Sequence, residues 1–327
     1  MAPDIRLPED IVAAKDVSAL DKIGQFLVIG ADEAAGKDEN ENYIQLLTKG
    51  DDGGYSVHKN ILLFEDDGSS GMEMDSEGIA VDREYIYVIG SHSSKRKALK
   101  PDKKYKKNRK RLRADRIEDE KSRDRLYRIR IDADGREIDR KSITLRGVFK
   151  QHPVLKMFRG IASKENGIDI EGIATKDGWL YLGFRGPVFR GNYVPVMKLK
   201  FDDHKSQNDL LYVRLGGRGI RSIASVSDGF LILAGPVGDG DGSYRLYHWD
   251  GKDLVPGEAR DVDIGKVQLL GEITPPAGGK AEGLAVMQEE DCSYHLLIAY
   301  DGVENLNDII QRFRVPKPLT GSWKSTH

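Results

Sequence analysis

Residues 75–92 read DSEGIAVDREYIYVIGSH, and the same pattern returns as DIEGIATKDGWLYLGFRG at 169–186 and as AEGLAVMQEEDCSYHLLIAYD at 281–301. Each copy opens with Glu-Gly, an apolar residue and Ala, passes through a turn, and ends in a second apolar run. Two further segments keep this rhythm with altered openings, SALDKIGQFLVIGADE at 18–33 and IRSIASVSDGFLILAGP at 220–236. Once an insertion at 94–125 is subtracted, the openings recur about every 50–60 residues, and such self-similarity indicates a repeat fold.

Each unit continues with an amphipathic strand and, in most units, with a fourth strand. The third strands read YIQLLTKG, RLYRIRID, VPVMKLKF, YRLYHWDG and IIQRFRVP, and the fourth strands read HKNILLF, REIDRKSI, LLYVRL and KVQLLGEI. Four-stranded units repeated along a chain form a β-propeller. We therefore predict an all-β fold, a single propeller domain over 1–327, with five blades favoured and six blades, one of them degenerate, as the alternative. The last unit lacks a fourth strand, and we expect the residues before Ser18 to supply it and close the ring.

The composition is that of a globular protein outside the membrane. Hydrophobic residues make up 39% and charged residues 32% of the 327 residues. No apolar run approaches the roughly 18 residues that span a bilayer. Cys292 is the single cysteine, so no disulfide forms within the chain. The N-terminal run MAPDIRLPEDIVAAKD lacks the basic and apolar regions of a secretory signal. Together these features predict a cytoplasmic protein.

A basic insertion interrupts the second unit at 94–125. Its first part, KRKALKPDKKYKKNRKRLR at 95–113, holds 12 Lys or Arg and one Asp, whereas the whole chain has a net charge of −2 and is therefore acidic elsewhere. Its second part carries opposite charges four residues apart, at Arg116 and Glu120 and at Asp119 and Arg123, which predicts a helix. Two interpretations remain open: an arm that contacts nucleic acid, another polyanion or an acidic protein, or a helical insertion folded against the acidic surface of this same protein.

The repeated glutamates are the first candidates for a functional site. The first strand of each propeller blade lines the central channel, so Glu77, Glu171 and Glu282 should point at one axial space. Converging carboxylates repel one another and need a cation, an arginine or protons. One interpretation is a Ca²⁺ or Mg²⁺ site built from the three glutamates together with Asp75, Asp169 and Asp301. The alternative is that each glutamate bonds the neighbouring blade and only holds the ring together.

Four arginines and one histidine complete the set of candidates. The arginines are Arg185, Arg190, Arg218 and Arg221. They predict either a clamp for a phosphate or carboxylate ligand or ion pairs with Glu171 and Glu282. His92 ends the second strand of its unit and is the candidate for acid–base catalysis, with a simple hydrogen-bonding role as the alternative.

Several runs between Asp75 and Asp301 carry a family resemblance. They are EGIA…YVIGSHS, EGIA…YLGFRGPVFRG, GGRGIRSIA…GFLILAGP…YRLYHW and AEGLAV…LLIAYDG. Together they resemble DUF3616, a bacterial family of unknown function, which implies a propeller and lends no known activity. A looser likeness, through the Glu-Gly openings, is to phytase-like esterases and calcium-dependent lactonases. That likeness implies that a Glu at the start of an inner strand binds metal, although the chain lacks the lactonases' full ligand set.

Two functional hypotheses follow from these features. The first is a propeller that binds a small anionic ligand, such as a phosphate ester, at the channel mouth with the help of a divalent cation; as an enzyme it would be a metal-dependent hydrolase of the esterase or phosphoesterase type. The second is a scaffold without chemistry that presents residues 95–113 to a polyanion or an acidic protein. The charge partners of the axial carboxylates distinguish the two hypotheses.

Overall fold

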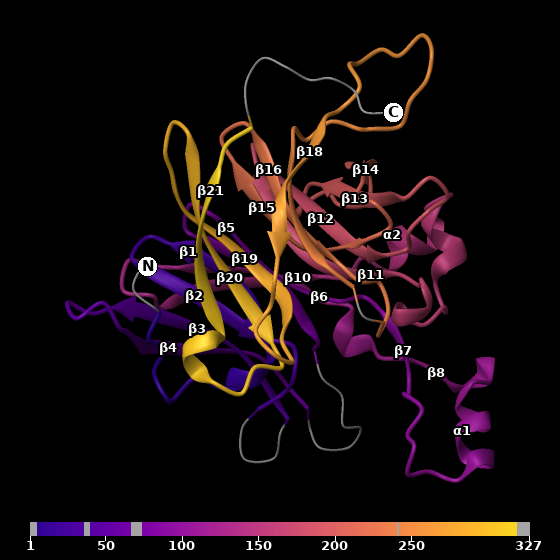
Figure 1. The fold of residues 1–327 in the computed structure, drawn as a ribbon, viewed down its shortest axis with the longest axis horizontal. Coiled ribbons are helices and arrows are strands. Elements are labelled where there is room, and N and C mark those ends of the chain that lie inside the picture. The colour runs from indigo at the N-terminus through magenta and orange to yellow at the C-terminus, as the bar shows by residue number, and fades with distance from the viewer. Residues whose placement is uncertain (1–4, 36–39, 67–73, 241, 319–327) are drawn as a thin grey trace.

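The computed structural model describes residues 5–35, 40–66, 74–240 and 242–318. Five antiparallel sheets follow one another along the chain (Figure 1). Blade one contains β1 (Val17–Ile23), β2 (Phe26–Ala31), β3 (Glu41–Lys49) and β4 (Tyr55–Glu65). Blade two contains β5 (Ser76–Asp82), β6 (Tyr85–Gly90), β9 (Leu126–Ile131) and β10 (Glu137–Ile143). Blade three contains β11 (Asp169–Lys176), β12 (Trp179–Gly186), β13 (Tyr193–Leu199) and β14 (Asn208–Arg214).

The remaining two blades complete the ring. Blade four contains β15 (Gly219–Val226), β16 (Gly229–Gly235), β17 (Tyr244–Trp249) and β18 (Val267–Ile273), and blade five contains β19 (Lys280–Glu289), β20 (Ser293–Asp301) and β21 (Ile310–Pro316). The first strands pack against one another in the circular order β1, β5, β11, β15, β19 and back to β1. The prediction of a five-bladed propeller is confirmed.

The hydrophobic core lies between neighbouring blades. One cluster joins blades one and two through residues such as Val28 and Ile86, and another joins blades two and three through Ile89 and Leu182. A further cluster joins blades three and four, and the largest joins blades four, five and one. Because each sheet is covered on both faces by its neighbours, its apolar residues are buried without any separate helical layer.

The N-terminal segment closes the ring in a different way from the one predicted. Ile5, Leu7 and Ile11 are buried in the core cluster that joins blades five and one, and the carbonyl of Arg6 accepts a backbone hydrogen bond from Tyr55 at 2.9 Å. Within residues 5–16, however, no strand forms, so the expectation of a fourth strand for blade five is wrong for the described part of the chain. The segment supplies apolar side chains to the joint instead of backbone pairing.

The insertion leaves blade two after β6 and rejoins it at β9. It contains a two-stranded ribbon, β7 (Ser94–Arg96) with β8 (Ile117–Asp119), and one short helix, α1 (Tyr105–Arg111). The predicted helix in the second part of the insertion is wrong. Residues 117–119 pair with β7, and Glu120 bonds Arg123 and Lys95 instead of Arg116. The only other α-helix of the described residues is α2 (Arg146–Gln151), and no described helix has the length and apolarity to span a membrane.

Candidate functional site at the channel mouth

Each inner strand carries an irregularity at the same position. The register between first and second strands skips one residue in every blade, at Ser18, Glu77, Glu171, Arg221 and Glu282. A bulge of this kind turns the extra side chain away from the regular alternation of the strand. The five blades therefore present a serine, three glutamates and one arginine at one height. The predicted equivalence of Glu77, Glu171 and Glu282 follows from this shared bulge.

The glycine after each glutamate allows the neighbouring blade to approach closely. A Cβ atom on Gly78 would lie 3.0 Å from Ile173 of the next inner strand, and one on Gly172 would lie 3.0 Å from Ile223. A Cβ on Gly283 would lie only 2.2 Å from Leu20 of blade one. The Glu-Gly pair thus combines an axial side chain with the close packing of strands that the ring needs.

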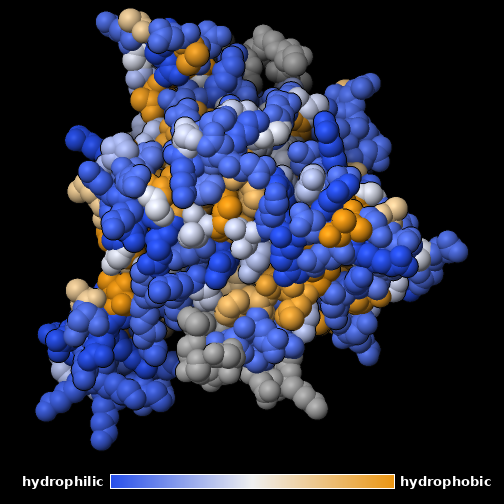
Figure 2. All heavy atoms as spheres, turned by 180° about the vertical axis from the view of Figure 1, so that it is seen from behind, coloured by the Kyte–Doolittle hydropathy of each residue, from blue (hydrophilic) through white to orange (hydrophobic). Residues whose placement is uncertain are grey.

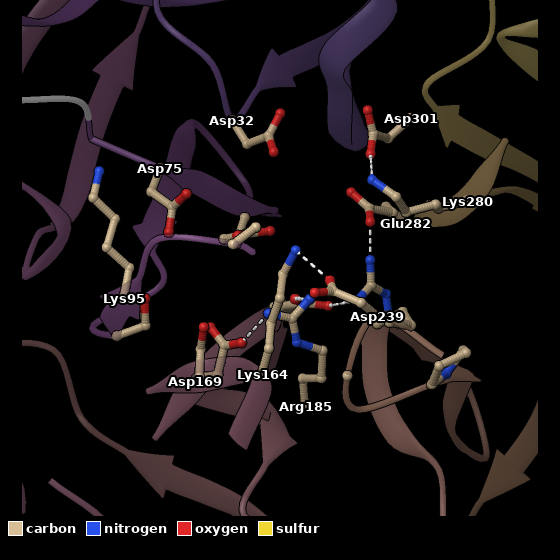
Figure 3. Close-up of a pocket in the computed structure, with 18 of the residues that line it drawn as sticks. Asp32, Asp75, Lys95, Lys164, Asp169, Arg185, Asp239, Lys280, Glu282 and Asp301 are labelled. Carbon is tan, nitrogen blue, oxygen red and sulfur yellow. Dashed lines mark hydrogen bonds and ion pairs between the residues drawn. The ribbon is translucent and has the colours of Figure 1, made fainter. Parts of the chain in front are cut away.

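A cavity of about 850 Å³ lies over these bulges. Its floor contains the axial glutamates and Arg221, and its walls contain residues from the ends of the first and second strands of the blades. The root of the insertion forms one side through Lys95, Lys97 and Leu112. Lys164 and Asp239 form an ion pair of 2.8 Å at the cavity, as Figure 3 shows. The channel mouth is therefore a deep polar site that residues distant in the sequence build together.

In blades three to five the carboxylates are neutralised by arginine and lysine. Arg185 pairs with Asp169 and, at 2.5 Å, with Glu171. Arg221 pairs with Glu171 at 2.9 Å and with Glu282. These residues form a continuous chain of alternating charges in which every side chain is almost fully buried. The interpretation of the arginines as partners of Glu171 and Glu282 thus describes the geometry, and both guanidinium groups are already engaged.

In blades one and two the carboxylates are not neutralised in this way. Glu77 has no hydrogen bond or ion pair with any described residue, and Asp32 accepts only the backbone N–H of Glu33, at 3.0 Å. Asp75, held with a positive φ of 56°, pairs with Arg123 from the insertion. Figure 3 shows Asp32 and Asp75 directed into the same space. This side of the mouth therefore carries an excess of negative charge.

Burial and mutual repulsion raise the pKa of these carboxyl groups. Burial, followed by repulsion from Glu171 and Asp75, raises the pKa of Glu77 well above its usual range. Burial, followed by repulsion from Asp301 and Asp75, does the same for the pKa of Asp32. Burial also raises the pKa of Asp169 to about 7, although the attraction of Arg185 opposes it. Each of these groups would be stabilised in its charged form by a nearby cation.

Three overlapping groups of carboxylates have ligand atoms within 4.8 Å of one another. They are Asp16 with Asp32 and Asp301, Asp32 with Asp75 and Glu77, and Glu77 with Asp169 and Glu171. Carboxylate oxygens are the ligands preferred by Ca²⁺ and Mg²⁺. The first and the central group each contain one carboxylate in an ion pair, Asp301 with Lys280 and Asp75 with Arg123. Only the central group holds both Asp32 and Glu77, whose pKa values are raised well above the usual range. Asp32, Asp75 and Glu77 therefore fit a hard divalent cation best.

His92 does not reach this site. Its ring is buried beside Phe149, it has a positive φ of 51°, and it does not line the cavity. Nδ1 lies 2.9 Å from the carbonyl oxygen of Gly90, and Nε2 accepts the N–H of Leu145 at 3.3 Å. Burial lowers its pKa. Both nitrogens of a neutral ring are thus occupied, and the geometry corresponds to the alternative prediction of a hydrogen-bonding role.

Arg190 and Arg218 also lie outside the cavity. Arg190 is exposed in the turn between β12 and β13, and Arg218 donates to the carbonyl and the hydroxyl of Ser243 at 2.8 and 2.5 Å. Of the four candidate arginines, the fold brings together only Arg185 and Arg221.

Sequence reasoning missed Asp32, Asp16 and Lys280. A signal for Asp32 was present, because Asp32 and Asp301 each follow the second apolar strand of a blade, in FLVIGAD and LLIAYD. The blade-one opening has Ser18 where other blades have Glu, which hid the equivalence. Lys280 lies two residues before Glu282 of the third Glu-Gly opening and pairs with Asp301.

Comparisons with known proteins give a family but no activity. A family model described as a protein of unknown function (DUF3616) matches residues 16–142 and 132–308. No curated protein sequence matches the chain.

The chain is also similar to several solved structures. An exo-β-1,3-galactanase from Phanerochaete chrysosporium is 7% identical to this chain, with a TM-score of 0.46. The match covers 96% of this chain and 63% of the galactanase, so the chain spans less than two thirds of that protein. A putative exo-β-1,3-galactanase from Bifidobacterium bifidum is 15% identical with a TM-score of 0.45, over 99% and 97% of the two chains. A GH43 protein from Bacillus licheniformis is 9% identical to this chain, with a TM-score of 0.43, and the match covers 97% of this chain and 60% of the GH43 protein. Such low values carry no information on a shared site.

Proposed function

The chain belongs to the DUF3616 family of proteins of unknown function, so a function has to be argued from its own site. We propose that the channel mouth binds a divalent cation, Ca²⁺ or Mg²⁺, together with a small anionic ligand. The observation that carries the proposal is the pair Asp32 and Glu77, two carboxylates at the cavity that form no ion pair with a basic side chain among the described residues. Asp75 completes the set of ligands. Because the pKa values of Asp32 and Glu77 are raised, a bound cation would take the place of protons on these two carboxyl groups.

The bound cation would be the main contact for an anion as the second component. When bound, the cation would polarise an oxygen of a phosphate or carboxylate group. Lys95, Lys97 and Lys280 lie around the same cavity, where they pair with Glu120, Glu118 and Asp301. Arg185 and Arg221 are committed to Glu171 and Glu282, so their part is to fix the floor of the site and not to clamp the ligand. A phosphate ester has the charge and size for this arrangement.

The test begins with chelator-treated protein. We expect Ca²⁺ or Mg²⁺ to raise the stability by about 2.7 kcal/mol at a hundredfold excess over the dissociation constant. The variants Glu77→Gln and Asp32→Asn should abolish this rise. Glu258→Gln, an exposed carboxyl group with no ion pair among the described residues, is the matched control and should keep it. A rise that persists in both site variants would exclude a cation at this position.

The anionic ligand is tested separately. Inorganic phosphate, titrated calorimetrically, should bind in the presence of saturating Ca²⁺ or Mg²⁺ and lose affinity at least tenfold without the cation. Hydrolysis of p-nitrophenyl phosphate under the same conditions then separates an enzyme from a binding protein. Phosphate binding of equal strength with and without the cation would contradict the proposed arrangement.

A further inference from the structure

The basic helix α1 stands apart from the propeller. Figure 1 shows α1 at the edge of the molecule beyond β7 and β8, and in Figure 2 the same lobe, at the lower left, is strongly hydrophilic. Tyr105 at its start is 74% exposed. None of the residues of α1 is buried. The helix is therefore held out into solvent, away from the acidic body.

The insertion does not neutralise its own basic helix. Most of its acidic residues lie in the second half and pair with bases outside α1. Glu118 pairs with Lys97, Glu120 with Lys95 and Arg123, and Asp119 with Arg146. By contrast, Lys104, Lys106, Lys107 and Lys110 have no side-chain partner in the described part of the chain. The interpretation of the insertion as a segment folded against its own acidic surface therefore fails for α1.

The helix is nevertheless firmly mounted. Arg96 donates to the carbonyl oxygens of Arg111 and Arg113 at 2.8 and 2.7 Å, and its other nitrogens pair with Glu165 of the body at 2.5 and 3.1 Å. Asn108 bonds both the N–H and the carbonyl of Lys100, at 3.3 and 2.8 Å. One face of the helix is thus fixed through Asn108, and the unpaired lysines remain on the other faces.

We infer that α1 is a docking element for duplex DNA, which it contacts through the phosphates and without sequence selection. Unpaired lysines on a rigid helix are suited to phosphate oxygens, which position a protein on nucleic acid without reading bases. The major groove of B-form DNA admits an α-helix and places a phosphate wall on each side of it, whereas the groove of duplex RNA is too narrow.

Single-stranded nucleic acid fits the helix less well. Binding of single strands depends on aromatic side chains that stack on the bases. The insertion at 94–125 contains one aromatic residue, Tyr105, and Arg109 already lies over its ring, 6.0 Å from the centroid. The contacts between the lysines and the phosphates are therefore the main source of affinity for nucleic acid.

The experiment measures anisotropy of a labelled DNA duplex of about 20 base pairs between about 50 and 200 mM salt. We expect salt-sensitive binding by the full chain. The variant Lys106→Gln/Lys107→Gln/Lys110→Gln should weaken it at least tenfold at the lowest salt and reduce the log–log salt slope by about 2.7, since each phosphate contact contributes about 0.9. Lys141→Gln/Lys150→Gln/Lys205→Gln removes the same charge from exposed positions of the propeller and should change the affinity less than twofold.

Three outcomes would overturn the inference: no binding at the lowest salt, equal losses in the two triple variants, or tighter binding of a single strand or an RNA duplex of the same sequence. Because the lysines are exposed, their replacement leaves the fold intact. Glu77→Gln and added chelator should leave DNA binding unchanged, which separates this inference from the cation site at the channel mouth.

Discussion

The two sides of the channel mouth use the same strands but treat their carboxylates in opposite ways. In blades three to five, Glu171 and Glu282 share the guanidinium of Arg221, which occupies the bulge of blade four. In blades one and two, the corresponding bulge of blade one holds Ser18, and Glu77 forms no ion pair with any described residue. One side is a closed network of ion pairs, and the other is a set of carboxylates open to a cavity.

Hydrogen bonds that do not involve Glu77 link the inner strand of blade two to both of its neighbours. The Ser18 hydroxyl donates to the carbonyl of Ser76 at 2.6 Å, and at the other end of the channel Thr175 of blade three bonds the carbonyl of Val81 at 2.6 Å. These contacts already link neighbouring inner strands. A purely architectural role therefore accounts for Glu171 and Glu282 but not for Glu77 and Asp32, which is why we assign the open side to ligand binding.

The largest effect should come from the closed side. Arg221→Met leaves Glu282 buried without a partner and removes one of the two partners of Glu171, so we expect a loss of about 3–5 kcal/mol in the free energy of unfolding. Urea denaturation measures it. Arg245→Met is the matched control, because Arg245 pairs with Glu272 at 2.8 Å on the surface, where such a pair contributes about 0–1 kcal/mol. Equal losses in the two variants would show that the network does not hold the blades.

The repeat made much of this comparison predictable. Blade number followed from five copies of one strand pattern, and the common height of the three glutamates followed from their common place in it. The pairing of Arg221 was among the predicted alternatives because the sequence places arginine where other units have Glu. What the local pattern could not give was which carboxylates lack a partner, since that depends on the side chains that four other blades bring to the axis.

His92 illustrates the same limit. The sequence places it correctly at the end of a second strand. The direction of its ring, however, depends on its positive φ and on the N–H of Leu145, which a segment some fifty residues later delivers. Contacts of this range are set by tertiary packing, and neither the local alternation nor the motif contains them.

A moderate effect should distinguish the open side by its pH dependence. A carboxyl group with a raised pKa binds its proton more tightly in the folded protein, so its stabilising contribution is complete below the unfolded pKa of about 4 and is lost as pH rises through the folded value. Glu77→Gln keeps the neutral form at every pH. In chelator, we therefore expect the stability of the variant relative to the wild type to increase as the pH rises from about 5 to 8.

This difference reports on Glu77 and on the carboxyl groups that repel it. Asp169, with a pKa of about 7, acts in the same direction, whereas His92, whose pKa is lowered, acts in the opposite one. His92 contributes equally to the wild type and the variant, whereas Asp169 loses the repulsion of Glu77 in the variant, which adds to the expected gain. Glu258→Gln is the control and leaves this cluster unchanged. A stability difference that is constant from pH 5 to 8 would mean that Glu77 titrates as an ordinary carboxyl group.

The smallest effect is expected at Arg190, the candidate arginine that belongs to neither half of the comparison. It is exposed and does not line the cavity, so Arg190→Ala should change the free energy of unfolding by less than about 0.5 kcal/mol. Calorimetric titration of phosphate in the presence of Ca²⁺ or Mg²⁺ should give the wild-type affinity. A weaker affinity of this variant for phosphate would mean that the anion site reaches the β12–β13 turn. Ligand binding would then not be confined to the side of the mouth formed by blades one and two.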